Sequence, residues 1–279
     1  MGANIGTTVT NILASLGYLR RGDDFRRAFA AATVHDIFNL LAVAVLLPVE
    51  LLTGYLSGVA GWITDLVIGT SGASFKSPLK AAVKMPAGWI KDLLSELGTQ
   101  GDLKGALMIV IGLVFIFVAL AFVTRNMRLL VADRVEAAIN RTLGAGSGLV
   151  AIVLGMIITV AVQSSSITTS VLVPLAAAGV LSLENVYPVT LGANVGTTVT
   201  ALLASLATGS PAAVTVALVH TLFNLSGIAL FYPVRSLRAL PIRLATGLAR
   251  ISAERRTWAV TYVLAMFLVI PLLGVMILR

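Results

Sequence analysis

The chain has 279 residues, of which 58% are hydrophobic and only 11% are charged, and its mean hydropathy is +0.98. Soluble domains are about 45–50% apolar and about 25% charged, so a water-soluble fold could not bury this much apolar surface. The net charge of +8 does not indicate nucleic-acid binding, because the basic residues lie in short runs between apolar segments. Composition therefore predicts a protein that lies in the lipid bilayer and does not bind nucleic acid.

Apolar stretches at 28–47, 107–122 and 260–278 approach or reach the ~20 residues that a membrane-spanning helix needs. They predict an all-α, polytopic transmembrane fold. Arginine-rich segments separate the apolar ones, and the positive-inside tendency assigns these segments to the cytoplasmic side. The arginine-rich segments are 20–27, 125–141 and 235–256. In chain order, the expected spanning helices are 28–50, 105–124, 186–207, 213–232 and 258–278.

An internal repeat organises the chain. Residues 2–10 read GANIGTTVT and residues 192–200 read GANVGTTVT, so the two copies differ at a single position. The order continues with HDIFNL at 35–40, matched by HTLFNL at 220–225. If the arginine-rich segments are cytoplasmic, matching helices of the two copies cross the membrane in opposite directions, which is an inverted-topology repeat. Such duplicated units often meet at the substrate site of a transporter.

A polar turn interrupts the second copy. Residues 163–170 read QSSSITTS and lie between two apolar arms, 149–162 and 171–181, each too short to span a membrane. This pattern predicts a re-entrant helical hairpin, which is tolerated at membrane depth only where it faces protein or a water-filled cavity. A helix that restarts at Ser165 or Ser166 directs free backbone N–H groups into that cavity, which suits a tetrahedral oxyanion. The amide and hydroxyl oxygens of the turn are also ligands for Na⁺.

The two GANxGTTVT segments carry glycines, an asparagine and paired threonines, so we expect them to form the facing wall of the site. The alternative is that their small residues only allow helices to pack closely. For the repeated His35 and His220, with Asn39 and Asn224, a paired role and plain interhelical hydrogen bonding both remain open. Asp36 is the one acid inside a predicted span and is either a site of asymmetric coupling or a partner for arginine.

Enzyme chemistry finds no support in the sequence. There is no cysteine, no cluster of His, Asp and Glu with metal-ligand spacing, and no Ser, His and acid arrangement. No nucleotide-binding motif is present either. We therefore expect a protein that is not an enzyme and that has no organic cofactor.

These motifs together resemble the type II sodium/phosphate cotransporter family. The resemblance rests on QSSS at 163–166, on both GANxGTTVT copies, on the ATVHDIFN and ALVHTLFN helices and on LPIRLATGLARISAERR at 240–256, and it covers nearly the whole chain. It implies a multi-pass symporter of the plasma membrane, or of the inner membrane in a bacterium. Such a protein moves inorganic phosphate by alternating access, with Na⁺ as the coupling ion.

The residues and the resemblance together predict the site. The substrate-binding residues are expected to be Gln163, Ser164, Ser165, Ser166, Thr168, Thr169, Asn194, Thr197, Thr198, Asn4, Thr7 and Thr8. The expected sodium ligands are Gln163, Ser164, Ser166, Thr169, Asn194 and Thr198. The chain divides into the remainder of a first repeat (1–50), an extracellular, partly amphipathic loop segment (51–104), a transmembrane helix with its cytoplasmic connector (105–141) and a second repeat (142–279).

One departure from the family pattern is expected to matter. Family members carry a QSSS turn in each repeat. The two copies are 190 residues apart, so the first copy's turn would lie before Met1. The sequence thus suggests an N-terminally truncated member, which binds phosphate poorly if the site needs both hairpins. The alternatives are a transporter or channel for another oxyanion, and a non-transporting phosphate sensor or scaffold.

Overall fold

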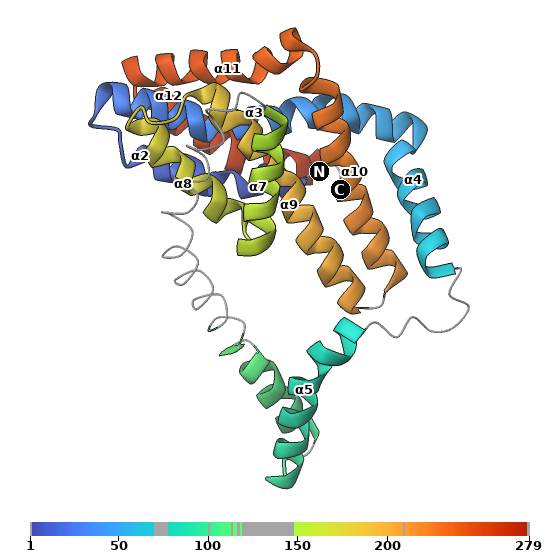
Figure 1. The fold of residues 1–279 in the computed structure, drawn as a ribbon. Helices are drawn as coiled ribbons and strands as arrows, with labels where there is room; N and C mark the ends of the chain where they lie inside the picture. Colours follow the sequence, from blue (N-terminus) through green and yellow to red (C-terminus); the bar gives the residue numbers. More distant parts are fainter. Residues whose placement is uncertain are drawn as a thin grey trace.

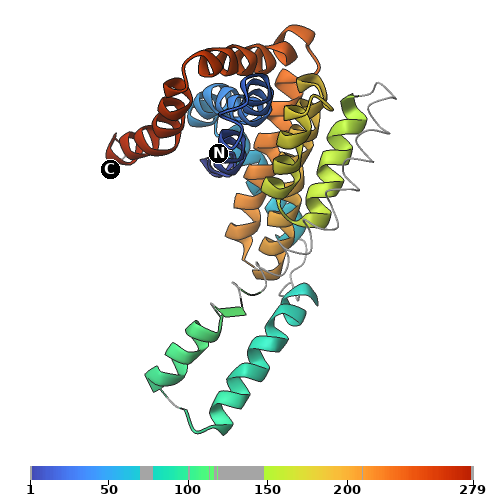
Figure 2. The same ribbon diagram turned by 90° about the vertical axis from the view of Figure 1, so that its left-hand side faces the viewer.

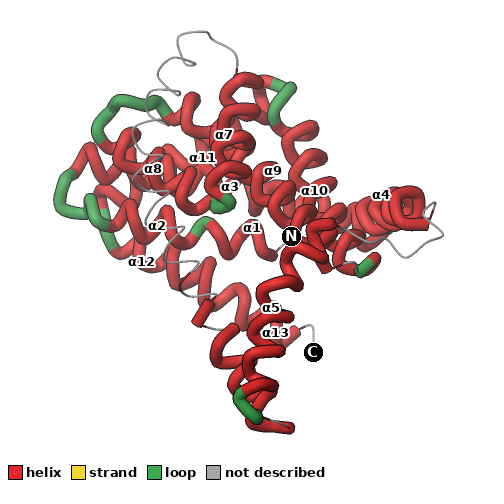
Figure 3. Tube along the Cα trace, turned by 60° about the horizontal axis from the view of Figure 1, so that its bottom comes forward, coloured by secondary structure: helices red, strands yellow, loops and turns green. Residues whose placement is uncertain are grey.

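A computed structural model describes residues 2–69, 78–99, 101–112, 114–115, 118, 148–208 and 210–277. All regular structure in these ranges is helical, which confirms the all-α prediction (Figure 3). The elements are α1 (Gly2–Thr7), α2 (Val9–Leu16), α3 (Gly22–Thr53), α4 (Tyr55–Thr64), the π-helical η1 (Asp65–Gly69), α5 (Pro78–Glu96), α7 (Gly148–Val162), α8 (Ser165–Ala177), α9 (Leu183–Thr208), α10 (Pro211–Phe231), α11 (Arg235–Glu254), α12 (Thr257–Leu264), the π-helical η2 (Ala265–Val269) and α13 (Ile270–Ile277). Residues 101–112 are helical as well.

Three described helices are long and apolar enough to cross a membrane, namely α3, α9 and α10. They match the predicted spans 28–50, 186–207 and 213–232: α3 and α9 are wider at both ends, while α10 begins two residues earlier and ends one residue earlier. The largest difference is at the start of α3, which begins at Gly22 and places Asp23 and Asp24 in its first turn. Two carboxylates at a helix N-terminus interact favourably with the helix dipole, and this explains the earlier start.

The C-terminal span is helical but not uniform. Predicted helix 258–278 is divided into α12, the π turn η2 and α13. The π turn comes just before Pro271, whose missing N–H and ring disturb the hydrogen bonds of the preceding turn. Of the span predicted at 105–124, only 105–112, 114–115 and 118 are described, all of them helical, and the rest lies outside the described residues.

Helix α11 is a finding that the sequence analysis missed, because the arginine-rich residues 235–256 were treated only as a connection. It runs alongside α3 (Figure 1). Its buried face consists of Pro241, Ala245, Ala249 and Ser252, which recur every three or four residues, while Arg243 and Arg250 are exposed. The third arginine-rich segment is therefore an amphipathic helix.

Helices α7 and α9 form the closest helix pair in the described structure (Figure 1). The backbones touch at glycines: a Cβ atom added to Gly155 would meet the carbonyl of Val189, and one added to Gly192 would meet the carbonyl of Ile152. Gly196 continues this interface one turn later. This arrangement is the small-residue packing of membrane helices, in which close backbone approach takes the place of a hydrophobic driving force.

Many large apolar side chains are exposed on the outside of the described bundle. Leu52 is 86% exposed, Leu51 is 77% exposed and Val216 is 70% exposed, all on helices that could span a membrane. Such a surface is costly in water and favourable in lipid. Helix α5 and the helical residues 101–112 lie side by side and project away from the bundle (Figures 1 and 2). The described chain is thus a lipid-facing helical bundle with a two-helix arm.

Candidate functional site

The QSSS turn lies between two short helices, as predicted. Helix α7 has 15 residues and α8 has 13, so each is about 20 Å long and too short to span a bilayer. The break is at Gln163, the only described residue other than glycine with a positive φ, at +55°. A left-handed conformation at a residue with a side chain costs about 1–2 kcal/mol, so the surrounding packing must hold it in place.

Backbone donors at the start of α8 are only partly used. Ser164 is the N-cap residue, and its side chain accepts a hydrogen bond from the Ile167 N–H at 3.3 Å, while its carbonyl accepts one from Thr168 N–H. The N–H groups of Ser165 and Ser166 have no hydrogen-bond partner in the described part of the chain. Two free donors at the positive end of a helix dipole form a favourable place for an oxyanion.

Buried hydroxyl groups hold this turn in shape. Thr169 donates to the carbonyl of Ser165 at 2.7 Å and accepts from the Asn11 side-chain amide at 2.7 Å. Thr168 donates to the Ser164 carbonyl, which lies 3.1 Å away. Thr168 and Thr169, both predicted to bind substrate, are fully buried and make these internal bonds. The geometry supports a positioning role for both of them.

The turn of the second repeat touches the motif of the first. Ser166 donates a weak hydrogen bond of 3.4 Å to the carbonyl of Thr7, and Asn11 of α2 reaches Thr169 of α8. The GANIGTTVT segment is itself broken here, since α1 ends at Thr7 and α2 begins at Val9. Two interruptions of a helix, one from each repeat, therefore meet at one location.

Asn4 and its partners form one half of a crossed network between the repeats. The Asn4 side-chain amide donates to the Asn224 side-chain oxygen at 2.5 Å, and His220 Nε2 lies 2.5 Å from the Asn4 side-chain oxygen. Asn39 donates to the Asn4 backbone carbonyl at 3.0 Å. Because an asparagine oxygen can only accept, His220 carries its proton on Nε2.

Asn194 repeats this pattern with the copies exchanged. Its amide donates to the Asn39 side-chain oxygen at 2.8 Å, and His35 Nε2 lies 2.6 Å from the Asn194 side-chain oxygen. Asn224 donates to the Asn194 backbone carbonyl at 3.1 Å. Each motif asparagine is thus held by the His and Asn of the opposite repeat, which confirms the interhelical hydrogen bonding expected of these residues.

The predicted site residues consequently do not all lie at the turn. Gln163, Ser164, Ser165 and Ser166 lie at the turn, and Thr7 contacts them from the first repeat. Thr168 and Thr169 bond to carbonyls of the turn from within α8, and Thr8 bonds to Asp36. The remaining four candidates lie on the network or on α9: Asn4, Asn194, Thr197 and Thr198. In the described residues, no hydrogen bond joins these four to the turn, and the hydroxyls of Thr197 and Thr198 donate to carbonyls of their own helix.

Asp36 lies in a polar cluster that exists in one repeat only. Its carboxylate is completely buried and accepts hydrogen bonds from the Thr8 hydroxyl at 2.8 Å and from the Tyr262 hydroxyl. The only ion pairs among the described residues lie elsewhere, so no arginine pairs with Asp36 there. In the second copy Thr221 takes its place and donates to the carbonyl of Ala217.

Three polar residues were missed by the sequence analysis: Asn11 and Thr159 beside the start of α8, and Tyr262 beside Asp36. Thr159 of α7 donates to the Thr168 hydroxyl at 2.9 Å. The side-chain oxygen of Asn11 is buried and has no hydrogen-bond partner in the described structure, which leaves a neutral oxygen of the kind that Na⁺ prefers. Asn11 has Ala201 as its counterpart, so the comparison of the two copies drew no attention to it.

Comparison with known proteins adds independent information. A sequence profile described as Na⁺/Pi-cotransporter matches residues 114–252. Sodium-dependent phosphate transport protein 2B of Bos taurus is 32% identical, over 98% of this chain and 52% of that protein. Transport protein 2A of Rattus norvegicus is 34% identical, over 97% of this chain and 53% of the relative. The chain spans about half the length of the curated relatives it matches. No solved structure matches it.

Proposed function

This chain belongs to the Na⁺/Pi-cotransporter family, and from that premise we propose that it moves inorganic phosphate across a membrane together with Na⁺. The observation that carries the proposal is the broken helix at Gln163–Ser164, which leaves free N–H groups at the start of α8 and contacts the other repeat through the Ser166 hydroxyl. The phosphate would bind at Ser165 and Ser166, and Gln163, Ser164 and Thr7 would complete its surroundings.

Charge balance supports coupling to sodium. Phosphate carries one to two negative charges near neutral pH, and burying them without compensation is strongly unfavourable. Among the described residues no lysine or arginine hydrogen-bonds to residues 163–166, so the positive group that this part of the chain supplies at the turn is the dipole of α8. Sodium ions bound to nearby neutral oxygens would supply the missing charge, and phosphate would then bind only when Na⁺ is present.

The remaining predicted residues keep roles in this proposal. Thr168 and Thr169 would hold the turn, and a sodium ion would use the oxygens of Gln163, Ser164, Ser166 and Thr169. Asn4 and Asn194, with Thr8, Thr197 and Thr198, would act at the interface where the two repeats move against each other, with Asn194 and Thr198 kept as candidate sodium ligands.

The cellular setting follows the same premise. We propose a multi-pass protein of the plasma membrane, or of the inner membrane in a bacterium, that acts as a transporter and not as an enzyme. Na⁺ would be its coupling ion, and no organic cofactor would be needed. The three long apolar helices and the short hairpin support this setting.

Equilibrium binding of radiolabelled phosphate to the purified chain tests the proposal, followed by uptake into proteoliposomes. We expect binding in Na⁺ and none in K⁺, because the proposed coupling ion is Na⁺, held by the oxygens of Gln163, Ser164, Ser166 and Thr169. S166A should weaken binding about tenfold by removing one donor to a charged ligand. S170A is the matched control, because Ser170 lies one turn further along α8 and donates to the carbonyl of Ile167.

Three results would count against the proposal. Equal phosphate binding in Na⁺ and K⁺ would exclude sodium coupling. Sulfate that competes as well as phosphate would indicate a transporter of another oxyanion. Sodium-dependent binding without uptake, in a chain verified as folded, would favour a phosphate sensor.

A further inference from the structure

A second candidate site lies away from the QSSS turn, at the opposite end of α8. A cavity of about 370 Å³ opens between the start of α3, the corner that joins α8 to α9, and helix α11. Three arginines line it, Arg26 and Arg27 from α3 and Arg250 from α11. None of the described residues that line it is acidic. The cavity therefore combines high positive charge with space for a ligand.

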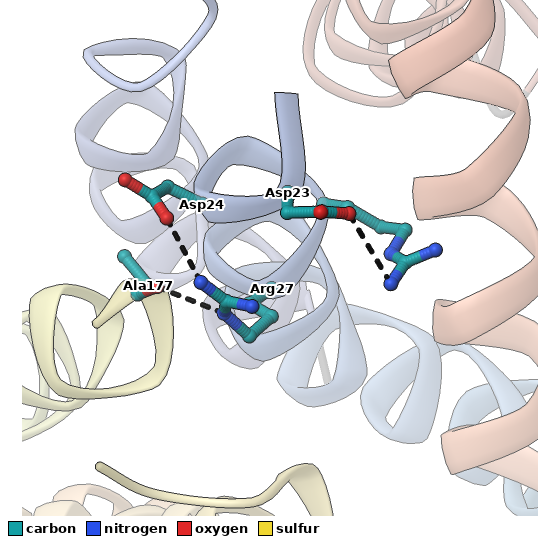
Figure 4. A network of polar contacts seen from close by, with 5 residues as sticks. Asp23, Asp24, Arg27 and Ala177 are labelled. Atoms are coloured by element: carbon teal, nitrogen blue, oxygen red, sulfur yellow. Dashed lines mark hydrogen bonds and ion pairs between the residues drawn. The ribbon is translucent and has the colours of Figure 1, made fainter. Parts of the chain in front are cut away.

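The three arginines differ in how firmly they are held. Arg27 is fixed, because it donates to Asp24 at 2.8 Å and to the Ala177 carbonyl at 2.9 Å (Figure 4). Arg26 makes one long contact of 3.4 Å with Asp23, and both side chains are at least half exposed. Such an exposed pair contributes little and is easily exchanged. Arg250 forms no ion pair in the described part of the chain.

The uncommitted arginines point to a phosphate group as the ligand. A guanidinium presents paired N–H donors that match two oxygens of a phosphate, and it is less strongly hydrated than an ammonium group. Ser182 lines the same cavity directly before α9 begins at Leu183, so a hydroxyl and the positive end of a long helix add to the arginines. The cavity and its arginines are the main determinants of this anion site, and the end of α9 makes a smaller contribution.

The rest of the lining indicates that the ligand also has an apolar part. Ala30, Ala176 and Leu181 form buried apolar wall, and each is less than a tenth exposed. The apolar stretch of α3 begins directly after Arg27, so the cavity lies where charged residues give way to a predicted membrane span. Basic pockets at the ends of membrane helices on the cytoplasmic side are typical binding places for anionic lipid headgroups.

We propose that this cavity binds the phosphate headgroup of an anionic phospholipid, with the glycerol and the start of the acyl chains on the apolar wall. An adjoining cavity of about 340 Å³ shares Arg26 and Arg250 but is also lined by Asp23 and Glu254. Those carboxylates repel a phosphate, so the headgroup is directed toward Arg27 and Ser182. The bound lipid would join α3, α11 and the corner after α8.

Binding of a short-chain lipid to the whole chain in an uncharged detergent tests this inference. The probes are dioctanoyl phosphatidic acid, dioctanoyl phosphatidylcholine and inorganic phosphate, each titrated by microscale thermophoresis in the presence of Na⁺. We expect saturable binding of phosphatidic acid and weak binding of phosphatidylcholine. R250Q should weaken phosphatidic acid about tenfold, because it removes one charged donor pair. R26Q together with R250Q should abolish saturable binding.

The matched control is R243Q, which removes an exposed arginine from the same helix outside the cavity. It should leave binding of phosphatidic acid unchanged. Equal loss in R243Q and R250Q would show a general charge effect and overturn the proposal, as would no loss in either variant while both elute as folded protein. If inorganic phosphate displaces phosphatidic acid, and R250Q weakens both, the cavity holds free phosphate and the lipid assignment is wrong. Phosphate bound at the QSSS turn should be insensitive to R250Q, which separates the two sites.

Discussion

The two copies of GANxGTTVT have nearly the same sequence but different surroundings. In the second copy the segment is the middle of the continuous helix α9, and its glycines pack against the backbone of α7. In the first copy it breaks between α1 and α2, and Gly2 and Gly6 have no neighbouring atom within 4 Å of an added Cβ. The asparagine has equivalent partners in both copies, a histidine and an asparagine of the opposite repeat. One motif therefore has two separable properties. Its asparagine makes the same kind of hydrogen bonds in both copies, whereas its glycines pack against another helix only in the second copy.

The largest expected effect comes from adding a methyl group to the glycine face. In G196A the new Cβ would lie 2.6 Å from the Thr159 Cβ and 2.8 Å from the Met156 carbonyl, so α7 must move. We expect a loss of about 3 kcal/mol in the free energy of unfolding. G6A, the matched change in the first copy, should be neutral or slightly stabilising. Thermal unfolding in detergent measures both, and equal destabilisation would contradict the difference between the copies.

Removal of a histidine from each half of the crossed network should have the next largest effect. H35A leaves the Asn194 side-chain oxygen without its donor in a fully buried place, and we expect a cost of about 2–3 kcal/mol. H220A removes the equivalent donor to Asn4, but His220 is only partly buried, so water can replace it at a cost of about 1 kcal/mol. A larger loss in H220A, measured by the same unfolding experiment, would reverse this ranking.

The polar cluster around Asp36 exists in the first repeat only, and mutations in it test what this asymmetric feature contributes to stability. Y262F removes one of the two hydroxyl donors to a buried carboxylate, and we expect a loss of about 2 kcal/mol. In a D36N background the same change should cost only about 1 kcal/mol, because the lost hydrogen bond is then between neutral groups. A double-mutant cycle gives the difference, and equal costs in the two backgrounds would mean that Asp36 is not charged in the folded protein.

The smallest expected change in stability is at Gln163, where the second repeat's turn meets the first repeat. Q163G should stabilise the fold by about 0.5–1 kcal/mol, because glycine adopts a positive φ without strain. Q163A keeps the strain and also lacks the amide. If the amide contributes to the site, both variants should lose sodium-dependent phosphate binding to the same extent, although only Q163G gains stability. Retention of binding in Q163G alone would mean that backbone shape matters and the amide does not.

Sequence reasoning predicted the long spans and the hairpin because each has a local signal. Apolar length identified α3, α9 and α10, and the polar QSSS turn between two short arms identified the break before α8. Helix α11 was missed because its arginines suggested a loop, whereas the alanines and the serine on its inner face fit closely against α3. A pattern of small buried residues on one face was the available signal.

The contacts of the site could not be predicted from sequence alone. That Ser166 reaches Thr7, or that Tyr262 reaches Asp36, depends on how distant helices cross, and no local pattern encodes it. The repeat did predict that His35 and His220, with Asn39 and Asn224, share one arrangement. It could not predict that each histidine bonds to the asparagine of the opposite copy. Hydrogen bonds within a copy and between copies would give the same repeated residues in the sequence.

The crossed hydrogen bonds also restrict how the two halves can diverge during evolution. A change at Asn4 leaves groups unpaired on His220 and Asn224 in the other half of the chain, and it does not affect the side-chain bonds of Asn194. Compensating substitutions should therefore arise between halves, so that position 4 varies together with 220 and 224 and position 194 varies together with 35 and 39. A duplicated gene held in this way can lose its internal symmetry elsewhere, as at Asp36 and Thr221, while these six positions change only in linked sets.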